Sequence, residues 1–401
     1  MTGGNSVRER PRRLALRGSR FFDGLTLRPD PVVVVLDGPV IDAVIDGTTP
    51  PADAELIDLP GATLLPGLID THVHLAFDAS ADPVVTLADR DDGAVRAAMT
   101  VAARTAVAGG VTTVRDLGDR DYLSLGLRDQ PGLPRILAAG PPITTFAGHC
   151  YFLGGAVADD ADAVRAAVRD RAERGCDVVK VMSSGGTMTP GTRQQDPQFQ
   201  REVLAAAVDE AHRLGLPLTA HAHGTSAIEN CIAAGVDGME HVTFWSAEGV
   251  DAPEHLMRAI ADRGIAVGAT VGLLPAPPGH TPPPAIMARL PQILAAMRHL
   301  AELGSVMVVG TDAGIAPVKP HDIVRTAVGQ LADIGIGPLE ALRITTSRAA
   351  QVLGLGERTG RLAAGYDADI LAIDGDPLTD PDAIHRILAV YARGIQVVPE
   401  R

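Results

Sequence analysis

Cysteine is scarce in this sequence, and long apolar runs are missing from it. The chain has three cysteines, Cys150, Cys176 and Cys231, among 401 residues. Because their number is odd and their spacing wide, they argue against a disulfide framework or a thiolate metal site, and we expect them to be small buried side chains. No segment offers the ~18 consecutive apolar residues of a membrane-spanning helix, so we expect no membrane partner.

Basic residues are also in short supply. The chain has 35 lysines and arginines against 49 aspartates and glutamates, a formal net charge of -14. Without a basic stripe, binding to nucleic acid or to an anionic membrane is disfavoured. The basic cluster at residues 8–13 precedes an apolar stretch too short for a secretory signal. We therefore expect a cytoplasmic protein that acts on a small-molecule substrate, and the sequence leaves a homo-oligomer open.

The apolar material that is present suffices for a large core. Hydrophobic residues make up 46% of the chain and charged residues 21%, which suits a globular protein with one large and one accessory domain. Residues 1–62 and 360–401 hold short apolar runs between turn signals, for example at 32–36 and 370–373. These runs predict strands that pair into one small discontinuous β domain, a composite β-sandwich that serves as a structural platform.

Residues 63–359 follow another pattern, in which short apolar runs alternate with alanine-rich segments of helical composition. Such alternation predicts an α/β fold with a parallel sheet and helices outside it. After the run ending near residue 74, the expected strand cores are 112–116, 136–139, 178–182, 218–221, 238–241, 266–271 and 307–310. Eight strands over roughly 300 residues predict a (β/α)8 TIM barrel rather than a doubly wound sheet. Helices are expected at 94–108, 161–174, 201–214 and 256–263.

The run at residues 64–75, Leu-Leu-Pro-Gly-Leu-Ile-Asp-Thr-His-Val-His-Leu, ends in two histidines separated by one residue. Alternate side chains of a strand share a face, so His72 and His74 can bind one ion while Val73 packs the other way. By itself the pair is as compatible with a hydrogen-bonded core pair as with a metal site.

Residues suited to metal chemistry recur where the later expected strands end. A barrel builds its active site at the C-terminal ends of its strands. Seven candidate residues fall there: His72, His74, Lys180, His221, His223, His241 and Asp312. Neutral imidazoles and carboxylates are suitable ligands for a divalent ion such as zinc.

Lys180 lies within the apolar run at residues 178–182, where strand alternation aims it into the barrel. A bare ammonium is costly there, so its charge must be compensated or removed. One interpretation is a lysine that snorkels to the barrel mouth or pairs with Asp116 or Asp312. The other is a deprotonated amine that captures carbon dioxide as a carbamate, which could bridge two metal ions. Residue chemistry alone leaves both open.

At this point the sequence resembles the metal-dependent amidohydrolase superfamily. Within it, the chain is most similar to the branch of imidazolonepropionase-like proteins that contains Xaa-Pro and other dipeptidases. The matching motifs run in order along the barrel and into the second β segment: LPGLIDTHVH at 65–74, VKVMSSGG at 179–186, AHAHG at 220–224, EH at 240–241, GTDAG at 310–314 and GRLAAGYDADI at 360–370.

The resemblance implies a centre of two divalent ions, for which zinc suits the donors. Its six ligands would be His72, His74, Lys180, His221, His241 and Asp312. The first two histidines and the aspartate would hold the more buried ion, and the other two histidines would hold the second. Carboxylated Lys180 would bridge the pair. This assignment rests on the resemblance and not on spacing alone.

The resemblance also implies the catalytic roles. A hydroxide that bridges the metals would attack the substrate carbonyl, and Asp312 would act as general base and pass the proton to the leaving amine. His223 shares the strand face of His221 but is not needed as a ligand. It would polarise the carbonyl and stabilise the oxyanion, and its alternative role is structural support of the ligands.

These roles predict a hydrolase that cleaves amide bonds of small substrates bearing a carboxylate, such as dipeptides or N-acyl amino acids. The main alternative is a cyclic-amide hydrolase or deaminase of the same superfamily with one metal ion, in which Lys180 would not be needed as a bridge. A scaffold protein without catalysis is least expected, because every ligand position is filled.

Four residues in segments that follow strands are candidate substrate contacts. His149 and Tyr151 lie in the segment after the third expected strand, and Arg193 and Lys319 are cationic groups able to bind a carboxylate. For each of these two cations taken individually, the sequence favours surface solvation, and only together with the resemblance do they favour binding of a carboxylate.

Two further features receive expectations of their own. Glu240 precedes His241 on the same strand, so we expect it to point out of the barrel in a structural role. The Pro-rich segment at residues 275–284 follows the seventh expected strand and would be either a lid or a stiff surface connection.

Overall fold

The computed structural model describes residues 13–279, 281 and 283–399. Most of the basic cluster at residues 8–13 and positions 280 and 282 of the Pro-rich segment thus lie outside the described residues. Among the described residues, no helix combines the length and the apolar character needed to cross a lipid bilayer. All three cysteines are described, and they are buried and free, as the sequence predicts.

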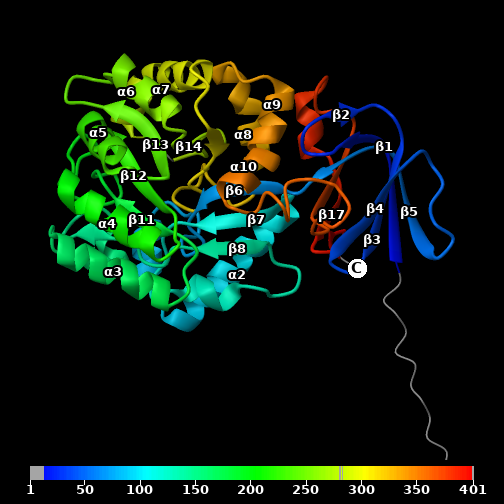
Figure 1. Cartoon of the computed structure of the whole chain (residues 1–401), viewed down its shortest axis with the longest axis horizontal. Coiled ribbons are helices and arrows are strands. Elements are labelled where there is room, and N and C mark those ends of the chain that lie inside the picture. The colour runs from blue at the N-terminus through cyan, green and yellow to red at the C-terminus, as the bar shows by residue number, and fades with distance from the viewer. Residues whose placement is uncertain (1–12, 280, 282, 400–401) are drawn as a thin grey trace, which may run out of the picture.

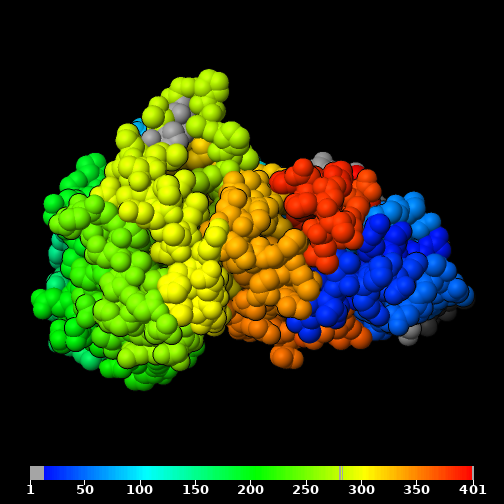
Figure 2. Space-filling view, turned by 90° about the horizontal axis from the view of Figure 1, so that it is seen from above, coloured from blue at the N-terminus to red at the C-terminus, as the bar shows by residue number. Residues whose placement is uncertain are grey.

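Strands from both ends of the chain pair in one sheet of eight strands, and Figures 1 and 2 show the blue and red segments together at one end of the molecule. Its order is β18-β17-β16-β5-β1-β3-β4, with β2 paired to β1. The strands are β1 (Arg13–Phe22), β2 (Leu27–Arg28), β3 (Val32–Asp37), β4 (Val40–Asp46), β5 (Ala54–Pro66), β16 (Ile370–Asp374), β17 (Ile387–Ala392) and β18 (Ile395–Val398).

The long strand β5 connects the two halves of this sheet. It pairs in parallel with β1 and, between Ala62 and Pro66, antiparallel with β16. Because its 13 residues serve both halves, hydrogen bonds link all eight strands into a single sheet, where we expected the two sheets of a sandwich. Side chains of both halves still share one buried cluster. β5 also crosses the domain boundary predicted after residue 62, and that boundary stays a prediction.

Eight parallel strands follow in the central part of the chain. They are β6 (Leu68–Val73), β7 (Val111–Asp116), β8 (Arg135–Ala138), β11 (Val179–Met182), β12 (Leu218–Gly224), β13 (Gly238–Trp245), β14 (Ala266–Ala269) and β15 (Met307–Val309). β6 to β8 form one sheet and β11 to β15 another. Isolated bridges, Val73↔Ala313 and Ile143↔Val181, lie between the two sheets at both edges. The short strands β9 (Thr144–Thr145) and β10 (Ala156–Val157) pair with each other.

Helices lie outside these parallel strands (Figure 1). The α-helices are α1 (Pro83–Ala88), α2 (Asp92–Ala108), α3 (Ala161–Glu173), α4 (Arg201–Arg213), α5 (Thr225–Ala234), α6 (Glu254–Asp262), α7 (Pro284–Glu302), α8 (Val324–Gln330), α9 (Pro338–Ile344) and α10 (Ser347–Val352). The 3₁₀ segments are η1 (Leu123–Leu127), η2 (Tyr151–Leu153), η3 (Leu331–Ile334) and η4 (Pro381–His385). The expected strands and helices are thus found, with ends that differ by a few residues.

Helix α3 illustrates why these segments form helices and where they pack. Asp160 caps its first turn by accepting a hydrogen bond from the backbone N–H of Ala163. Its buried residues Val164, Val168 and Arg171 recur at helical spacing, so one face of the helix packs inward. Covering helices of this kind leave the C-terminal ends of the parallel strands along one rim, where a site can form.

Gly67 joins the sheet of the chain ends to the first parallel strand. Its backbone N–H donates to the carbonyl of Asp369, 3.0 Å away, so the junction is tied to the C-terminal segment. A Cβ atom at this position would lie 2.1 Å from Oγ1 and 2.7 Å from Cβ of Thr112. The junction therefore accepts no side chain without moving β7.

We predict that Gly67→Ala lowers the free energy of unfolding by about 1–3 kcal/mol, because the added methyl overpacks the junction. Thermal and denaturant unfolding measure the effect. Gly329→Ala in α8 is the matched control, since no atom lies within 4 Å of a Cβ placed there, and helix propensity should raise its stability by up to about 1 kcal/mol. Equal stability of the Gly67→Ala variant and the wild type would contradict the prediction.

Candidate metal centre

Three donor side chains meet where β6 and β15 end. The Nε2 atoms of His72 and His74 lie 3.3 Å apart, and Oδ1 of Asp312 is 3.5 and 3.2 Å from them. Backbone hydrogen bonds hold the two strand ends together, from Asp312 N to the His72 carbonyl (2.7 Å) and from His74 N to the Ala313 carbonyl (2.9 Å). The side chains of the three residues are at most 12% exposed. Their donor atoms lie close enough for one cation to hold all three.

A second group forms at the ends of β12 and β13. The donor atoms of His221, His223 and His241 lie within 4.8 Å of one another. The rings of His223 and His241 stack at 4.3 Å, and the ring of His72 lies 5.3 Å from that of His241. The two groups are therefore neighbours. The second group includes His223, which the sequence analysis placed outside the ligand set.

Each of four histidines is oriented by a hydrogen bond on the side away from the cluster. These bonds are His74 Nδ1 to the Gly118 carbonyl (2.9 Å), His221 Nε2 to the Gly185 carbonyl (3.1 Å), His223 Nδ1 to Thr243 Oγ1 (2.9 Å) and His241 Nδ1 to Thr270 Oγ1 (2.7 Å). The other nitrogen of each ring is left for the cluster. Metal-binding histidines characteristically hold their second nitrogen in this way, so the residues present fit divalent ions.

Burial keeps most of these imidazoles neutral, as metal ligands must be. It lowers the pKa of His72 to about 4 and that of His223 to about 3. It also holds the pKa of His221 and of His241 well below the ordinary value. Burial opposes the charge of Asp312 too, but the neighbouring His72 and His74 outweigh it and hold the pKa of that carboxyl well below its usual range. The centre thus offers neutral nitrogens and an anionic oxygen.

Lys180 lies on β11 with a side chain only 1% exposed. Its Nζ has no hydrogen-bond partner among the described residues, so it neither snorkels to solvent nor binds Asp116 or Asp312 directly. Burial lowers the pKa of this amine to about 8, against the charges of Glu240 and Asp312, which raise it. The amine is thus enclosed, and its pKa lies below the ordinary lysine value.

The side chain of Glu240 does not point outward as we expected from the sequence. Its carboxylate is 1% exposed and points toward His72, with Oε2 3.4 Å from Nδ1, and not outward as strand alternation predicted. Regular alternation fails here because φ is +75° at His241 and +48° at Val242, so neighbouring side chains face the same way. Gly268 lies opposite on β14 and leaves room for the carboxylate.

Comparison with known proteins agrees with this geometry. The model of the amidohydrolase family matches residues 63–397. The chain belongs to this family. Ochratoxinase of Aspergillus niger is 29% identical over 79% of this chain and 71% of its own length. Imidazolonepropionase of Chromobacterium violaceum is 25% identical over 87% of this chain and 84% of its own.

Solved structures give the same relationship. The structure of a Xaa-Pro dipeptidase with methionine bound in its active site superposes with a TM-score of 0.82. The two sequences are 26% identical, and the superposition covers 96% of this chain and 99% of the dipeptidase chain. The protein is thus an amidohydrolase-superfamily hydrolase, similar to imidazolonepropionase and Xaa-Pro dipeptidase, as its motifs predicted.

Of the candidate substrate contacts in this amidohydrolase, His149 lies closest to the donor cluster. It is 4% exposed, and its ring is 4.7 Å from that of His221. Tyr151 is 46% exposed and lies edge-on to Phe152 at 6.2 Å. His149 therefore borders the donor cluster, and Tyr151, two residues later, presents its ring to solvent.

The two candidate cations occupy different surroundings. Arg193 pairs with Asp196, Nε to Oδ2 at 2.7 Å, and lines a hollow of about 230 Å³ with Gly148 and Gly185. Lys319 is 7% exposed and donates from Nζ to the Thr311 carbonyl at 2.5 Å. Arg193 is thus accessible to solvent at the hollow that it lines, whereas Lys319 is enclosed next to Thr311, the residue before Asp312.

Sequence reasoning missed the residues that orient the ligands. Thr243 and Thr270 have side chains bound to imidazoles, and Arg115 pairs with Glu240. Thr243 follows His241 by two residues, a spacing that could have drawn notice. Thr270 and Arg115 carried no local signal, because only the fold brings their strands beside the histidines.

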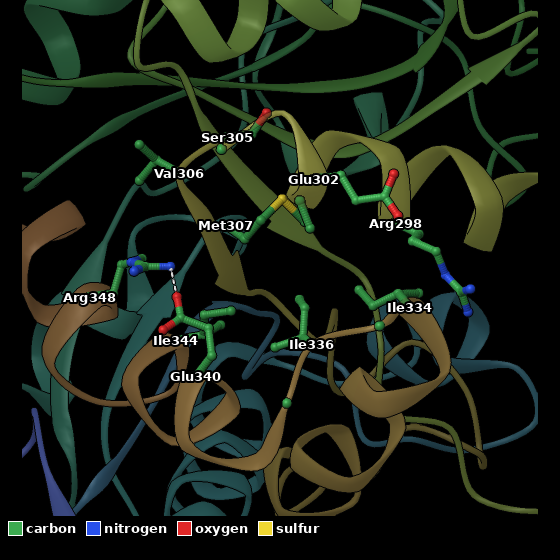
Figure 3. Close-up of a pocket in the computed structure, with 14 residues that line it drawn as sticks. Arg298, Glu302, Ser305, Val306, Met307, Ile334, Ile336, Glu340, Ile344 and Arg348 are labelled. Carbon is green, nitrogen blue, oxygen red and sulfur yellow. Dashed lines mark ion pairs between the residues drawn. The ribbon is translucent and has the colours of Figure 1, made fainter.

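A hollow of about 470 Å³ lies at the opposite end of β15, before that strand begins (Figure 3). Ser305, Met307 and Ile336 line it, and an Arg348–Glu340 ion pair crosses its edge. None of the donor side chains of the metal centre lines this hollow. This hollow, the larger of the two described, is therefore separate from the donor cluster at the C-terminal ends of the strands.

Proposed function

We propose that this amidohydrolase cleaves amide bonds of small substrates that bear a carboxylate, such as dipeptides or N-acyl amino acids, at a centre of two zinc ions. The observation that carries the proposal is the convergence of buried imidazoles with Asp312, with most outer nitrogens already hydrogen-bonded. A cytoplasmic location and self-association are further predictions.

We also propose that the eight parallel strands close into a TIM barrel. Support comes from the bridges at both sheet edges and from the hydrogen bonds around them, Ile143 N to the Lys180 carbonyl and Met182 N to the Ile143 carbonyl, each 2.8 Å. Closure places all strand C-termini on one ring and so gathers donors from strands far apart in sequence.

Two sets of residues would hold the ions. His72, His74 and Asp312 would hold one, and His221 and His241 the other, while Lys180 would bridge them as a carbamate. The enclosed amine of Lys180, which has no hydrogen-bond partner among the described residues, supports the bridge, because a carbamate would give it two oxygens that can bind the ions. The grouping of His223 with the second set makes it the alternative ligand there.

When bound, the ions would polarise the substrate carbonyl and lower the pKa of a water molecule. Asp312 lies 8% exposed at the open side and would take the proton of the attacking water and deliver it to the leaving amine. His223 would donate from Nε2 to the developing oxyanion, because the Thr243 hydroxyl can donate to its Nδ1 and leave the ring proton on Nε2.

The proposed substrate class rests on the side chains near the donor cluster and on the similarity to known hydrolases. His149 and Tyr151 would contact the substrate, and Arg193 in its hollow would bind the carboxylate. Lys319, proposed with them from the sequence, is enclosed and would act on the substrate only through the charge that it places near Asp312. The similarity to a Xaa-Pro dipeptidase and to ochratoxinase supports an amide substrate.

A second candidate function is hydrolysis of a cyclic amide at a single metal ion. The similarity to imidazolonepropionase favours it. In that case the bridge at Lys180 is not required, and metal content distinguishes the two candidates.

We predict about two divalent ions per chain by elemental analysis of protein purified without chelators. Lys180→Ala should lose at least one of them, because the bridge is removed. Arg193→Met is the control, and it should keep the wild-type content, since Arg193 lies outside both donor groups. A wild-type content near one ion that Lys180→Ala leaves unchanged would favour the mononuclear alternative.

We predict that His223→Asn lowers kcat by roughly 10² to 10⁴, the range for a lost acid-base or oxyanion group, and keeps the metal content. Steady-state kinetics and elemental analysis of the same preparation measure both. His212→Asn is the control, because His212 is exposed and paired with Asp237. Loss of metal from His223→Asn would reverse the assignment of the two histidines, so that His223 would be the ligand and His221 the supporting residue.

We predict faster hydrolysis of dipeptides and N-acyl amino acids with a free C-terminus than of the same compounds amidated or esterified. A panel that also contains cyclic amides and lactones measures kcat/KM for each. Arg193→Met should raise KM for the free acids more than for the capped compounds. Preference for capped substrates contradicts the carboxylate handle, and activity on cyclic amides alone supports the second candidate function.

A further inference from the structure

A buried ion pair crosses the barrel interior next to the donor cluster. Glu240 on β13 accepts from Arg115 on β7, Nη2 to Oε1 at 2.9 Å, and from Thr219 Oγ1 on β12 at 2.9 Å. Arg115 also donates from Nε to the Thr71 carbonyl at 2.7 Å. Glu240 is 1% and Arg115 6% exposed. The carboxylate is therefore held in one position by groups from β12, which neighbours β13, and from β7, which belongs to the other sheet.

The second oxygen of that carboxylate faces His72. Oε2 of Glu240 lies 3.4 Å from Nδ1 of His72. Neither atom makes a hydrogen bond to any described residue, so the two buried polar atoms face each other without other partners. The other four histidines of the centre have their outer nitrogen hydrogen-bonded to a carbonyl or a hydroxyl. Glu240 thus supplies for His72 the contact that the remaining ligands obtain elsewhere.

Two glycines make room for this arrangement. A Cβ atom at Gly268 would lie 1.9 Å from Oε2 of Glu240. A Cβ atom at Gly310 would lie 2.7 Å from Cβ of His72 and 3.0 Å from the same oxygen. Any larger residue at either position would displace the carboxylate or the imidazole, so the absence of side chains there is part of the arrangement.

We propose that Glu240, held by Arg115, is a positioning residue for metal binding. Its Oε2 accepts the Nδ1 proton of His72, which fixes the tautomer whose Nε2 lone pair faces His74 and Asp312. Loss of such an outer carboxylate typically costs 10- to 100-fold in metal affinity. The competing explanation is that Glu240 only neutralises Arg115, in which case metal affinity would not depend on it. The proposal rests on the metal centre proposed above.

Metal affinity of the full chain tests this without reference to any substrate. Zinc binding is measured by competition with a chromophoric chelator for the wild type, Glu240→Gln and Gly268→Ala, with thermal unfolding of each. Glu240→Gln keeps the size of the side chain but places an amide NH2 group or a neutral carbonyl oxygen opposite His72, and the carbonyl oxygen is a weaker acceptor than the carboxylate. Gly268→Ala keeps every charge but displaces the carboxylate of Glu240. Both should bind zinc 10- to 100-fold more weakly.

The control is another enclosed ion pair, Arg135–Asp367, whose atoms lie 2.5 Å apart with side chains 17% and 13% exposed. Asp367→Asn should lower the thermal stability and leave zinc affinity unchanged. Nitrogen NMR of the zinc-loaded wild type should find His72 protonated at Nδ1, an observation that a purely structural role for Glu240 does not require.

Unchanged zinc affinity in a folded Glu240→Gln, or an equal loss in Asp367→Asn, overturns the proposal. If Glu240→Gln does not fold, Gly268→Ala and Thr219→Val decide, since Thr219→Val removes one hydrogen bond to the same carboxylate. A wild-type chain that binds no zinc would instead refute the metal centre itself, so the two failures are distinguishable.

Discussion

The removal of polar donor groups from water is the constraint on which the rest of the structure depends. His72, Lys180 and Glu240 are each 1% exposed, and Asp312 only 8%. Burying such groups without partners is costly, and it is tolerated here because surrounding strands supply most of the hydrogen bonds in advance. The donor atoms of the imidazoles and of Asp312 converge in two small groups, and the buried amine of Lys180 has no hydrogen-bond partner among the described residues.

The choice of cations follows the same constraint. The chain has two lysines, Lys180 and Lys319, and both are buried near Asp312, whereas its other basic residues are arginines. An ammonium can lose its proton when it is desolvated, but a guanidinium cannot. Arg115 accordingly pairs with the carboxylate of Glu240, whereas the Nζ of Lys180 has no hydrogen-bond partner among the described residues.

The sheet of the chain ends supports the centre at one strand. Gly67 N–H donates to the Asp369 carbonyl and Ile69 N–H donates to the Thr345 carbonyl, at 3.0 and 2.8 Å. These bonds anchor β6, the strand that carries His72, from its N-terminal side. The sheet of the chain ends contributes none of the donor groups of the centre.

Sequence by itself determined the alternation of strands and helices, the pairing of both chain ends and the residues that meet at the strand ends. Period and composition report burial locally, and a parallel α/β fold converts strand ends into one rim. Tertiary structure decided what depends on contacts between strands distant in sequence. It turned Glu240 inward through the positive φ values of His241 and Val242, and it merged the expected sandwich into one sheet through β5. It also enclosed Lys319. The direction and the solvent exposure of a side chain depend on residues distant in sequence that pack against it, and the local sequence does not show which residues these are.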